Sequence, residues 1–170
     1  MSSSKQGFYS RIKLVSCWFR FVMNLRLPFF GLRIHILHVA PDWREIAIRM
    51  QLSLRNMNYA GTYFGGGLFA MTDPFFMPVQ VLGSDYPVRD TSGNIQFPQP
   101  GRGPVHAPFR LSHEQINEVR EKTADGEKFE PTWRVDIVVA SGEIIATVDK
   151  TIYIRRKPKK RQGSAKMNPC

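Results

Sequence analysis

The residues best suited to chemistry lie between Asn58 and Pro74, where three glycines, Gly65 to Gly67, open an apolar run that contains one carboxylate, Asp73. A helix that begins with glycines presents backbone N–H groups to an electron-rich oxygen, with no side chain in front of them. A carboxylate one or two turns further along can act as a base or a nucleophile. The combination predicts an acyl-transfer site in which Gly65, Gly66 and Asp73 are the central groups.

Each of these residues also has a purely structural interpretation. The glycines would let a helix begin close to a strand, and Asp73 would satisfy backbone groups where Pro74 interrupts the helix. Asn58 would cap a helix or close a turn, and the nearby aromatic side chains would be ordinary core residues. The residues alone leave three roles open: catalysis, ligand binding without turnover, and a structural or partner-binding role.

Other classes of site find little support in the sequence. The four histidines, at positions 35, 38, 106 and 113, show no metal-ligand spacing with each other or with a cysteine. The sequence contains neither a phosphate loop of the Walker type nor a serine-centred nucleophile elbow. We therefore expect neither a metal ion nor an organic cofactor.

Charge is distributed unevenly along the 170 residues. Residues 1–41 contain six Lys or Arg and residues 155–170 contain seven, with no acidic residue in either segment. Residues 42–154 hold 11 basic and 14 acidic residues. Basic ends on a mildly acidic body are typical of contact with an anionic surface. No base-reading module accompanies the basic run at the C-terminal end, so we do not expect a nucleic-acid partner.

Cysteine content and hydropathy bear on the compartment. Cys17 and Cys170 do not have the spacing of a disulfide framework, which favours a reducing environment. The most apolar N-terminal window, residues 12–32, is interrupted by three basic residues, so it predicts neither a membrane span nor a secretory signal. We expect a cytoplasmic protein that also has the means to contact a membrane surface.

Hydrophobic periodicity predicts an α+β protein. Apolar side chains alternate with polar ones most clearly at residues 45–54, which predicts a strand. The run from Gly65 to Leu82 is apolar nearly all round and predicts a long buried helix. Ser112 and Gln115 form a capping box for a polar helix. Together these predict about six mostly antiparallel strands around a long central helix. The predicted strands are residues 32–36, 45–54, 94–97, 105–111, 133–139 and 144–154, and the other predicted helices are residues 8–25 and 114–123.

Three segments are expected: a basic amphipathic helix in residues 1–26, a folded domain in residues 27–157, and a disordered basic tail in residues 158–170. The helix pattern fits two arrangements, a helix on a membrane surface and a helix packed on the domain's own sheet. Its predicted apolar face contains Phe8, Ile12, Val15, Trp18, Phe19 and Val22, with Lys13, Arg20 and Asn24 opposite.

The order of these elements, together with several longer motifs, resembles the hotdog-fold superfamily of acyl-CoA thioesterases. The resemblance extends from about Leu27 to Lys157 and is closest to a branch known only as a domain of unknown function. It implies a hotdog fold, in which a curved sheet wraps a long central helix, and a homodimer or dimer of dimers with its sites at a subunit interface. The motifs are Arg26–Gly31, Ala40–Arg44, Asn58–Pro74, Pro100–Gly103, Gly126–Pro131 and Lys150–Ile154.

Thioesterases of the phenylacetate-degradation type are better understood members of that superfamily. They carry an asparagine, then a His-Gly-Gly at a helix start, then an aspartate nine residues after the histidine. Asn58, Gly65, Gly66 and Asp73 match this spacing, whereas Phe64 stands in the place of the histidine and cannot donate a hydrogen bond. The resemblance implies that the two glycine amides stabilise the carbonyl oxygen, Asp73 acts as base or nucleophile, and Asn58 orients water or substrate.

The resemblance also implies the substrate class, an acyl thioester carried by coenzyme A or by a carrier protein. The acyl group would lie against apolar residues of the helix, and a loop arginine would contact a coenzyme A phosphate. Hydrolysis of acyl-CoA is the favoured function, and a hotdog dimer that binds acyl-CoA or lipid without turnover, or that is purely structural, is the alternative. The expected substrate-contacting residues are Thr62, Phe64, Gly67, Phe69, Phe76 and Arg102.

Overall fold

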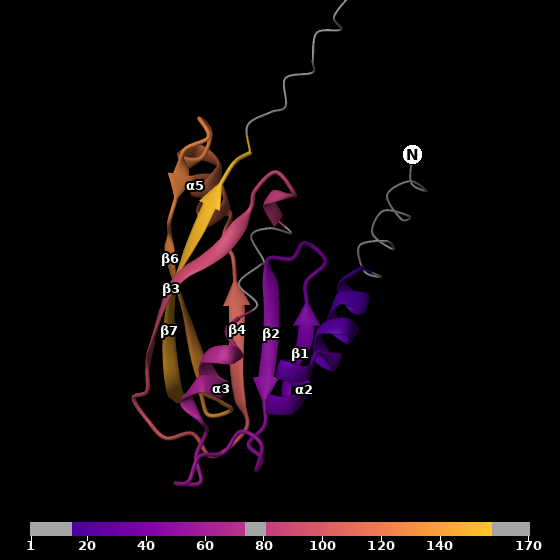
Figure 1. Cartoon of the computed structure of the whole chain (residues 1–170), viewed down its shortest axis with the longest axis vertical. Coiled ribbons are helices and arrows are strands. Elements are labelled where there is room, and N and C mark those ends of the chain that lie inside the picture. Colours follow the sequence, from indigo (N-terminus) through magenta and orange to yellow (C-terminus); the bar gives the residue numbers. More distant parts are fainter. Residues whose placement is uncertain (1–14, 74–80, 158–170) are drawn as a thin grey trace, which may run out of the picture.

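Antiparallel strands form one sheet in the order β1-β2-β4-β6-β7-β3, and a short seventh strand, β5, pairs with β7 (Figure 1). The structure is a computed structural model that describes residues 15–73 and 81–157. The chain is helical from residue 15 to 25, ahead of the first labelled element. The elements are α2 (Leu27–Leu32), β1 (Ile34–Val39), β2 (Glu45–Met50), α3 (Gly65–Ala70), β3 (Val88–Gln96), β4 (Val105–Arg110), α5 (His113–Lys122), β5 (Lys128–Phe129), β6 (Thr132–Val139) and β7 (Ile144–Arg155).

The core lies on one face of this sheet, and α3 lies in front of that face in Figure 1. Alternation along the central strands directs every second side chain to the core. Leu68 of α3 and Met71 just beyond it are buried there. Gly67 sits where an added Cβ would contact Leu32 at 3.7 Å and the sulfur of Met50 at 3.9 Å. The buried side chains of β2, β4 and β6 include Ile46, Ile48, Met50, Val105, Ala107, Phe109, Val135 and Ile137.

The predicted long helix from Gly65 to Leu82 is wrong in its extent. Helix α3 ends at Ala70, and the amides of Thr72 and Asp73 bond to the carbonyls of Phe69 and Ala70 in a closing turn. Asp73 precedes a proline, which disfavours helical geometry at Asp73. Residues 74–80 of the predicted helix lie outside the described residues.

The other predicted elements agree with the structure to different degrees. Strands β4, β6 and β7 lie within one residue of the prediction at each end, and the capping box of Ser112 and Gln115 is confirmed at the start of α5. Strand β2 ends at Met50, four residues early, because a turn begins at Ser53. Strand β3 begins at Val88, six residues before the prediction, because its mostly polar, exposed side chains give no alternation.

The two edges of the sheet differ. At β1, the side chain of Asn24 accepts a hydrogen bond from the Ile36 amide at 2.7 Å and donates one to the Ile36 carbonyl at 3.2 Å. Arg20 donates to the Leu37 carbonyl at 2.9 Å. The N-terminal helix therefore occupies that edge with side-chain partners. Strand β3 forms the opposite edge and is mostly exposed, so its outer backbone groups can pair with another strand.

The N-terminal helix packs on the domain with only part of its predicted apolar face, because Val15, Trp18 and Val22 are exposed. Phe19 turns inward and meets Trp43 edge to face, with 4.9 Å between ring centroids. Arg20 and Asn24, which the pattern placed opposite the apolar face, bond to β1. Trp43 is held in the β1–β2 turn with a φ of 60°. In the described parts of the chain, no helix has both the length and the hydropathy needed to cross a membrane.

Candidate active site at the start of helix α3

A cavity of about 400 Å³ opens at the first turn of α3. Its lining includes Asn58, Thr62 and Gly65, three of the residues that the sequence singled out. The opposite wall is the segment that follows β3, from Phe97 to Gly101. Polar groups therefore converge with an aromatic wall, as is typical of small-ligand sites.

Asn58 organises the loop that leads into α3. Its side-chain oxygen accepts hydrogen bonds from the amides of Ala60 and Thr62, at 2.9 and 3.1 Å. Its side-chain nitrogen donates to the Thr62 hydroxyl at 2.9 Å and to the Tyr63 carbonyl at 3.2 Å. Because both N–H groups of the side chain have protein acceptors, Asn58 acts here by holding Thr62 and the helix start in place.

The first residues of α3 carry the groups proposed to stabilise negative charge. Phe64 is the residue before the helix and has extended backbone angles, with no side-chain cap. By helix geometry, the amides of Gly65 and Gly66 have no acceptor within the helix. A Cβ on Gly65 would lie 2.9 Å from the Phe97 ring, and one on Gly66 would collide with the Phe64 ring. Glycine at these two positions lets the half-exposed rings lie against the helix start, and a larger residue would displace them.

This geometry predicts different outcomes for two Gly→Ala substitutions in one helix. Gly65→Ala forces the half-exposed Phe97 ring out of place and should weaken the binding of a ligand held in the cavity about tenfold, which is about 1.4 kcal/mol. Gly67→Ala meets only ordinary contacts and should leave binding unchanged. Isothermal titration with both variants tests this, and equal losses would show that the pocket does not depend on the Gly65–Phe97 approach.

Tyr63 lines the pocket and joins two segments around it through its hydroxyl group. It is 4% exposed, and its hydroxyl lies 3.0 Å from the Met50 carbonyl and 2.8 Å from the Gly103 carbonyl. The hydroxyl thereby ties the end of β2 to the loop before β4. Burial raises the pKa of Tyr63 from 10.0 to about 12, and this outweighs the opposite effects of backbone groups and Arg49.

The raised pKa makes the contribution of Tyr63 to stability depend on pH. Because the folded-state pKa exceeds the unfolded one, the contribution is complete below pH 10.0 and is lost as pH rises toward about 12. A shift of this size corresponds to about 2–3 kcal/mol. Urea unfolding of wild type and Tyr63→Phe should differ by about 1–3 kcal/mol at neutral pH, and the difference should shrink above pH 10.0. A difference that stays constant with pH would contradict this role.

Asp73 lies beyond the other end of α3. It comes eight positions after Gly65 and three positions after the last residue of the helix, Ala70. The Asp73 side chain is 72% exposed, and its carboxylate lies 3.5 Å from Nζ of Lys150. Asp73 does not line the cavity. Within a single chain, the carboxylate and the glycine amides are therefore at separate places.

Lys150 is a buried cation that the sequence analysis did not single out. It is 1% exposed and takes the core-facing position of β7 between Val148 and Ile152. Its Nζ lies 2.6 Å from the Asp90 carboxylate on β3 and 5.2 Å from the centroid of the Phe69 ring. The ammonium therefore joins the β3 edge to the end of α3. The alternation Val148, Lys150, Ile152 was the signal that could have identified it.

The structure separates the other predicted site residues into groups. Phe64 and Gly66 are exposed at the rim of the helix start, whereas Gly67 faces the core. Phe69 packs beside Lys150, and Arg102 is exposed in the loop after the pocket residue Gly101. Phe76 lies outside the described residues.

A second residue that the sequence analysis passed over supports the helix start. Asn56 is buried, and its side-chain nitrogen donates to the carbonyls of Leu32 and Gln51 at 2.6 and 3.0 Å. Its backbone carbonyl accepts a hydrogen bond from the Phe64 amide at 2.8 Å. Asn56 thus connects α2, the end of β2 and the start of α3, and an asparagine in a turn-like stretch gives no sign of such distant partners.

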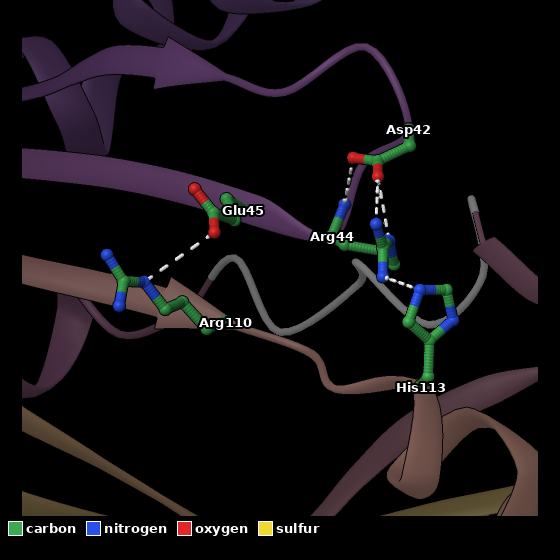
Figure 2. A network of polar contacts seen from close by, with 5 residues as sticks. All are labelled: Asp42, Arg44, Glu45, Arg110 and His113. Carbon is green, nitrogen blue, oxygen red and sulfur yellow. Dashed lines mark hydrogen bonds and ion pairs between the residues drawn. The ribbon is translucent and has the colours of Figure 1, made fainter.

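A second hollow, of about 770 Å³, lies where β2 begins and β4 ends, beside the start of α5. Figure 2 shows Arg44 between Asp42 and His113, with Glu45 and Arg110 paired next to it. Burial raises the pKa of Asp42, but the hydrogen bonds and charge of Arg44 outweigh it and lower the pKa overall. These side chains bind each other, so the network serves to attach the β1–β2 turn to α5.

Among the described residues, no three His, Cys, Asp or Glu side chains are grouped so as to hold a metal ion.

Comparison with solved structures shows the fold. A protein of unknown function from Pseudomonas aeruginosa, described as a probable thioesterase, is 18% identical and has a TM-score of 0.71, over 81% of this chain and 93% of that one. A thioesterase from Haemophilus influenzae is 16% identical with a TM-score of 0.58, over 82% of this chain and 90% of that one. The phenylacetic acid degradation protein PaaI from Thermus thermophilus is 24% identical with a TM-score of 0.51, over 74% and 96%.

The protein therefore has the hotdog fold of thioesterase-like proteins, as the sequence motifs predicted. Among curated proteins, none matches the sequence. The model of one family, described as a domain of unknown function, matches residues 16–154, most of the chain. The chain belongs to this family, DUF4442.

Proposed function

We propose that the protein is a homodimer that hydrolyses acyl thioesters of coenzyme A or of a carrier protein. The observation that carries the proposal is the cavity at the start of α3, where the Gly65 amide and the Asn58–Thr62 loop meet an aromatic wall. Thioesterase-like relatives with the same fold support the substrate class.

The dimer supplies what one chain lacks. Asp73 lies beyond the C-terminal end of α3, and the Gly65 amide lies at its start, so a shared site would place Asp73 of one protomer at the glycine amides of the other. Strand β3 is the open edge of the sheet, and it runs directly into the pocket residue Phe97. Pairing of two β3 edges would bury that edge and bring two pockets to one interface.

The reaction follows from these groups. Asp73 takes a proton from water as the water oxygen attacks the thioester carbonyl carbon. The carbonyl oxygen gains negative charge and accepts hydrogen bonds from Gly65 and Gly66, and one such donor lowers the barrier by about 3 kcal/mol. The C–S bond then breaks, the thiol leaves with the proton held by Asp73, and a carboxylic acid remains.

Binding without turnover is the second candidate, and Phe64 favours it. Its side chain stands at the helix start, is exposed, and has no polar atom that could contact a carbonyl oxygen. In that case Phe64 and Phe97 would hold an acyl group at the rim of the cavity.

A thioesterase assay over a panel of acyl-CoA chain lengths, combined with light scattering, separates these candidates. Wild type should release thiol and show the mass of a dimer. Asn94→Lys places a charge on the exposed β3 edge and should abolish both the dimer and the hydrolysis. Asn117→Lys makes the same change on the exposed side of α5 and should keep both.

Two results would overturn parts of the proposal. A fully active Asn94→Lys monomer would contradict the shared site. If no thioester is hydrolysed while acyl-CoA raises the melting temperature, binding without turnover replaces hydrolysis.

A further inference from the structure

The N-terminal helix has a second apolar face that the domain does not cover. Phe19 and Met23 pack toward the core, but the adjacent arc of the helix is directed to solvent. Trp18 is 68% exposed, and its ring centroid lies 5.9 Å from that of the exposed Phe21. We call this arc the outer face; its exposed residues are Val15, Trp18, Phe21, Val22 and Leu25.

The outer face is continuous, because its residues recur at helical spacing and share one side of the helix. Leu27 and Phe30 of α2, the next helix along the chain, are also exposed. A monomeric soluble domain rarely exposes so many large apolar side chains together without a partner.

The charges around the outer face indicate what covers it. Between residues 15 and 41 the chain contains three arginines, Arg20, Arg26 and Arg33, and no acidic residue. A second copy of this helix would bring the same positive charges together with no acid to offset them. Arg20 is bonded to β1, whereas Arg26 is exposed just beyond the end of the helix. A large apolar face with aromatic residues, on a segment whose only charges are positive, suits an anionic lipid surface, where the apolar side chains enter the acyl boundary and an exposed arginine such as Arg26 meets the headgroups.

We propose that the outer face docks the protein on anionic membrane, with the helix lying in the plane of the surface. The helix lies beside β1, at the opposite edge of the sheet from β3, as Figure 1 shows. Docking through the outer face would therefore leave the β3 edge free for a second protomer. The proposal is independent of the chemistry at α3 and does not require the protein to be an enzyme.

Vesicle sedimentation with the full chain tests the proposal. Wild type should sediment with vesicles of phosphatidylcholine and phosphatidylglycerol, should bind vesicles of phosphatidylcholine alone more weakly, and should lose affinity as salt is added. Trp18→Ser with Val22→Ser removes two exposed side chains and should weaken binding more than about tenfold. Leu54→Ser, at a leucine that is 88% exposed and lies away from the helix, is the control and should bind like wild type.

A measurement on the unmodified protein complements the variants. Bromine-labelled acyl chains should quench Trp18 fluorescence, since Trp43 is buried, Trp133 is partly buried in β6, and Trp18 is the exposed indole of the outer face. Unchanged sedimentation of the Trp18→Ser, Val22→Ser variant would overturn the proposal and assign vesicle binding to charge elsewhere, such as the basic C-terminal segment. Loss of the dimer in that variant would also overturn it, because the outer face would then be an interface between copies.

Discussion

Asp73→Asn should reduce the kcat for acyl-CoA hydrolysis by about 10²- to 10⁴-fold, the range over which a positioned general base contributes to rate. Asparagine keeps the shape of the side chain and an oxygen near Lys150, but it cannot accept a proton from water. Substrate affinity should change little, because asparagine has nearly the same size as the aspartate that it replaces. Steady-state kinetics with a thiol-release assay would measure both quantities.

Asp149→Asn is the matched control for this substitution. Asp149, on β7, is like Asp73 a carboxylate with a basic partner, in this case Arg134 at 2.8 Å. Its neighbours Val148 and Lys150 face the core, so Asp149 is directed to the other face of β7. Asp149→Asn should keep full activity. If Asp73→Asn also keeps it, Asp73 is neither base nor nucleophile.

The second large effect concerns stability and the buried Lys150. Asp90→Asn removes the closer of the two carboxylates around the ammonium, which lies at 2.6 Å, and leaves Asp73 at 3.5 Å. Breaking a buried ion pair costs about 3–5 kcal/mol, and we expect about 3 kcal/mol because Asp90 is partly exposed. In a chain of this size that loss lowers the melting temperature by roughly 6–12 °C.

Removing the Lys150 ammonium should lower the free energy of unfolding by less than Asp90→Asn does. Lys150→Met keeps the volume and leaves two carboxylates that are 40% and 72% exposed and can be hydrated. The double variant Lys150→Met, Asp90→Asn should be no less stable than Lys150→Met alone. Calorimetry of wild type, the two single variants and the double variant gives the unfolding free energies for a double-mutant cycle. Additive losses would show that Asp90 stabilises the sheet independently of Lys150.

How far the sequence predicts the fold depends on burial. Strands β4, β6 and β7 each bury one face, so alternation located them to within a residue. Strand β3 is exposed on most positions and gives no alternation, and its early part was missed. Hydrophobicity alone suggested a long helix after Gly65, but apolar content does not determine where a helix ends. The helix ends at the turn that precedes Asp73.

In the candidate site, the sequence predicts groupings of residues that are close along the chain but not those that are distant. Asn58, Thr62 and Gly65 are close in sequence, and the structure brings them together in one cavity. The pairing of Lys150 with Asp90 joins residues 60 positions apart, which local pattern cannot reveal. The position of Asp73 relative to the glycines involves a second chain in our proposal, so neither one sequence nor one protomer contains the complete arrangement.

Mixing two inactive variants tests the shared site most directly. Asp73→Asn lacks the carboxylate, and Gly65→Trp fills the cavity at the helix start, so each homodimer should be inactive. In a mixture that has exchanged subunits, half of the dimers are mixed, and each mixed dimer regains one intact site. The account predicts recovery of about a quarter of wild-type activity. A mixture that exchanges subunits yet hydrolyses no thioester, although wild type does, would contradict it.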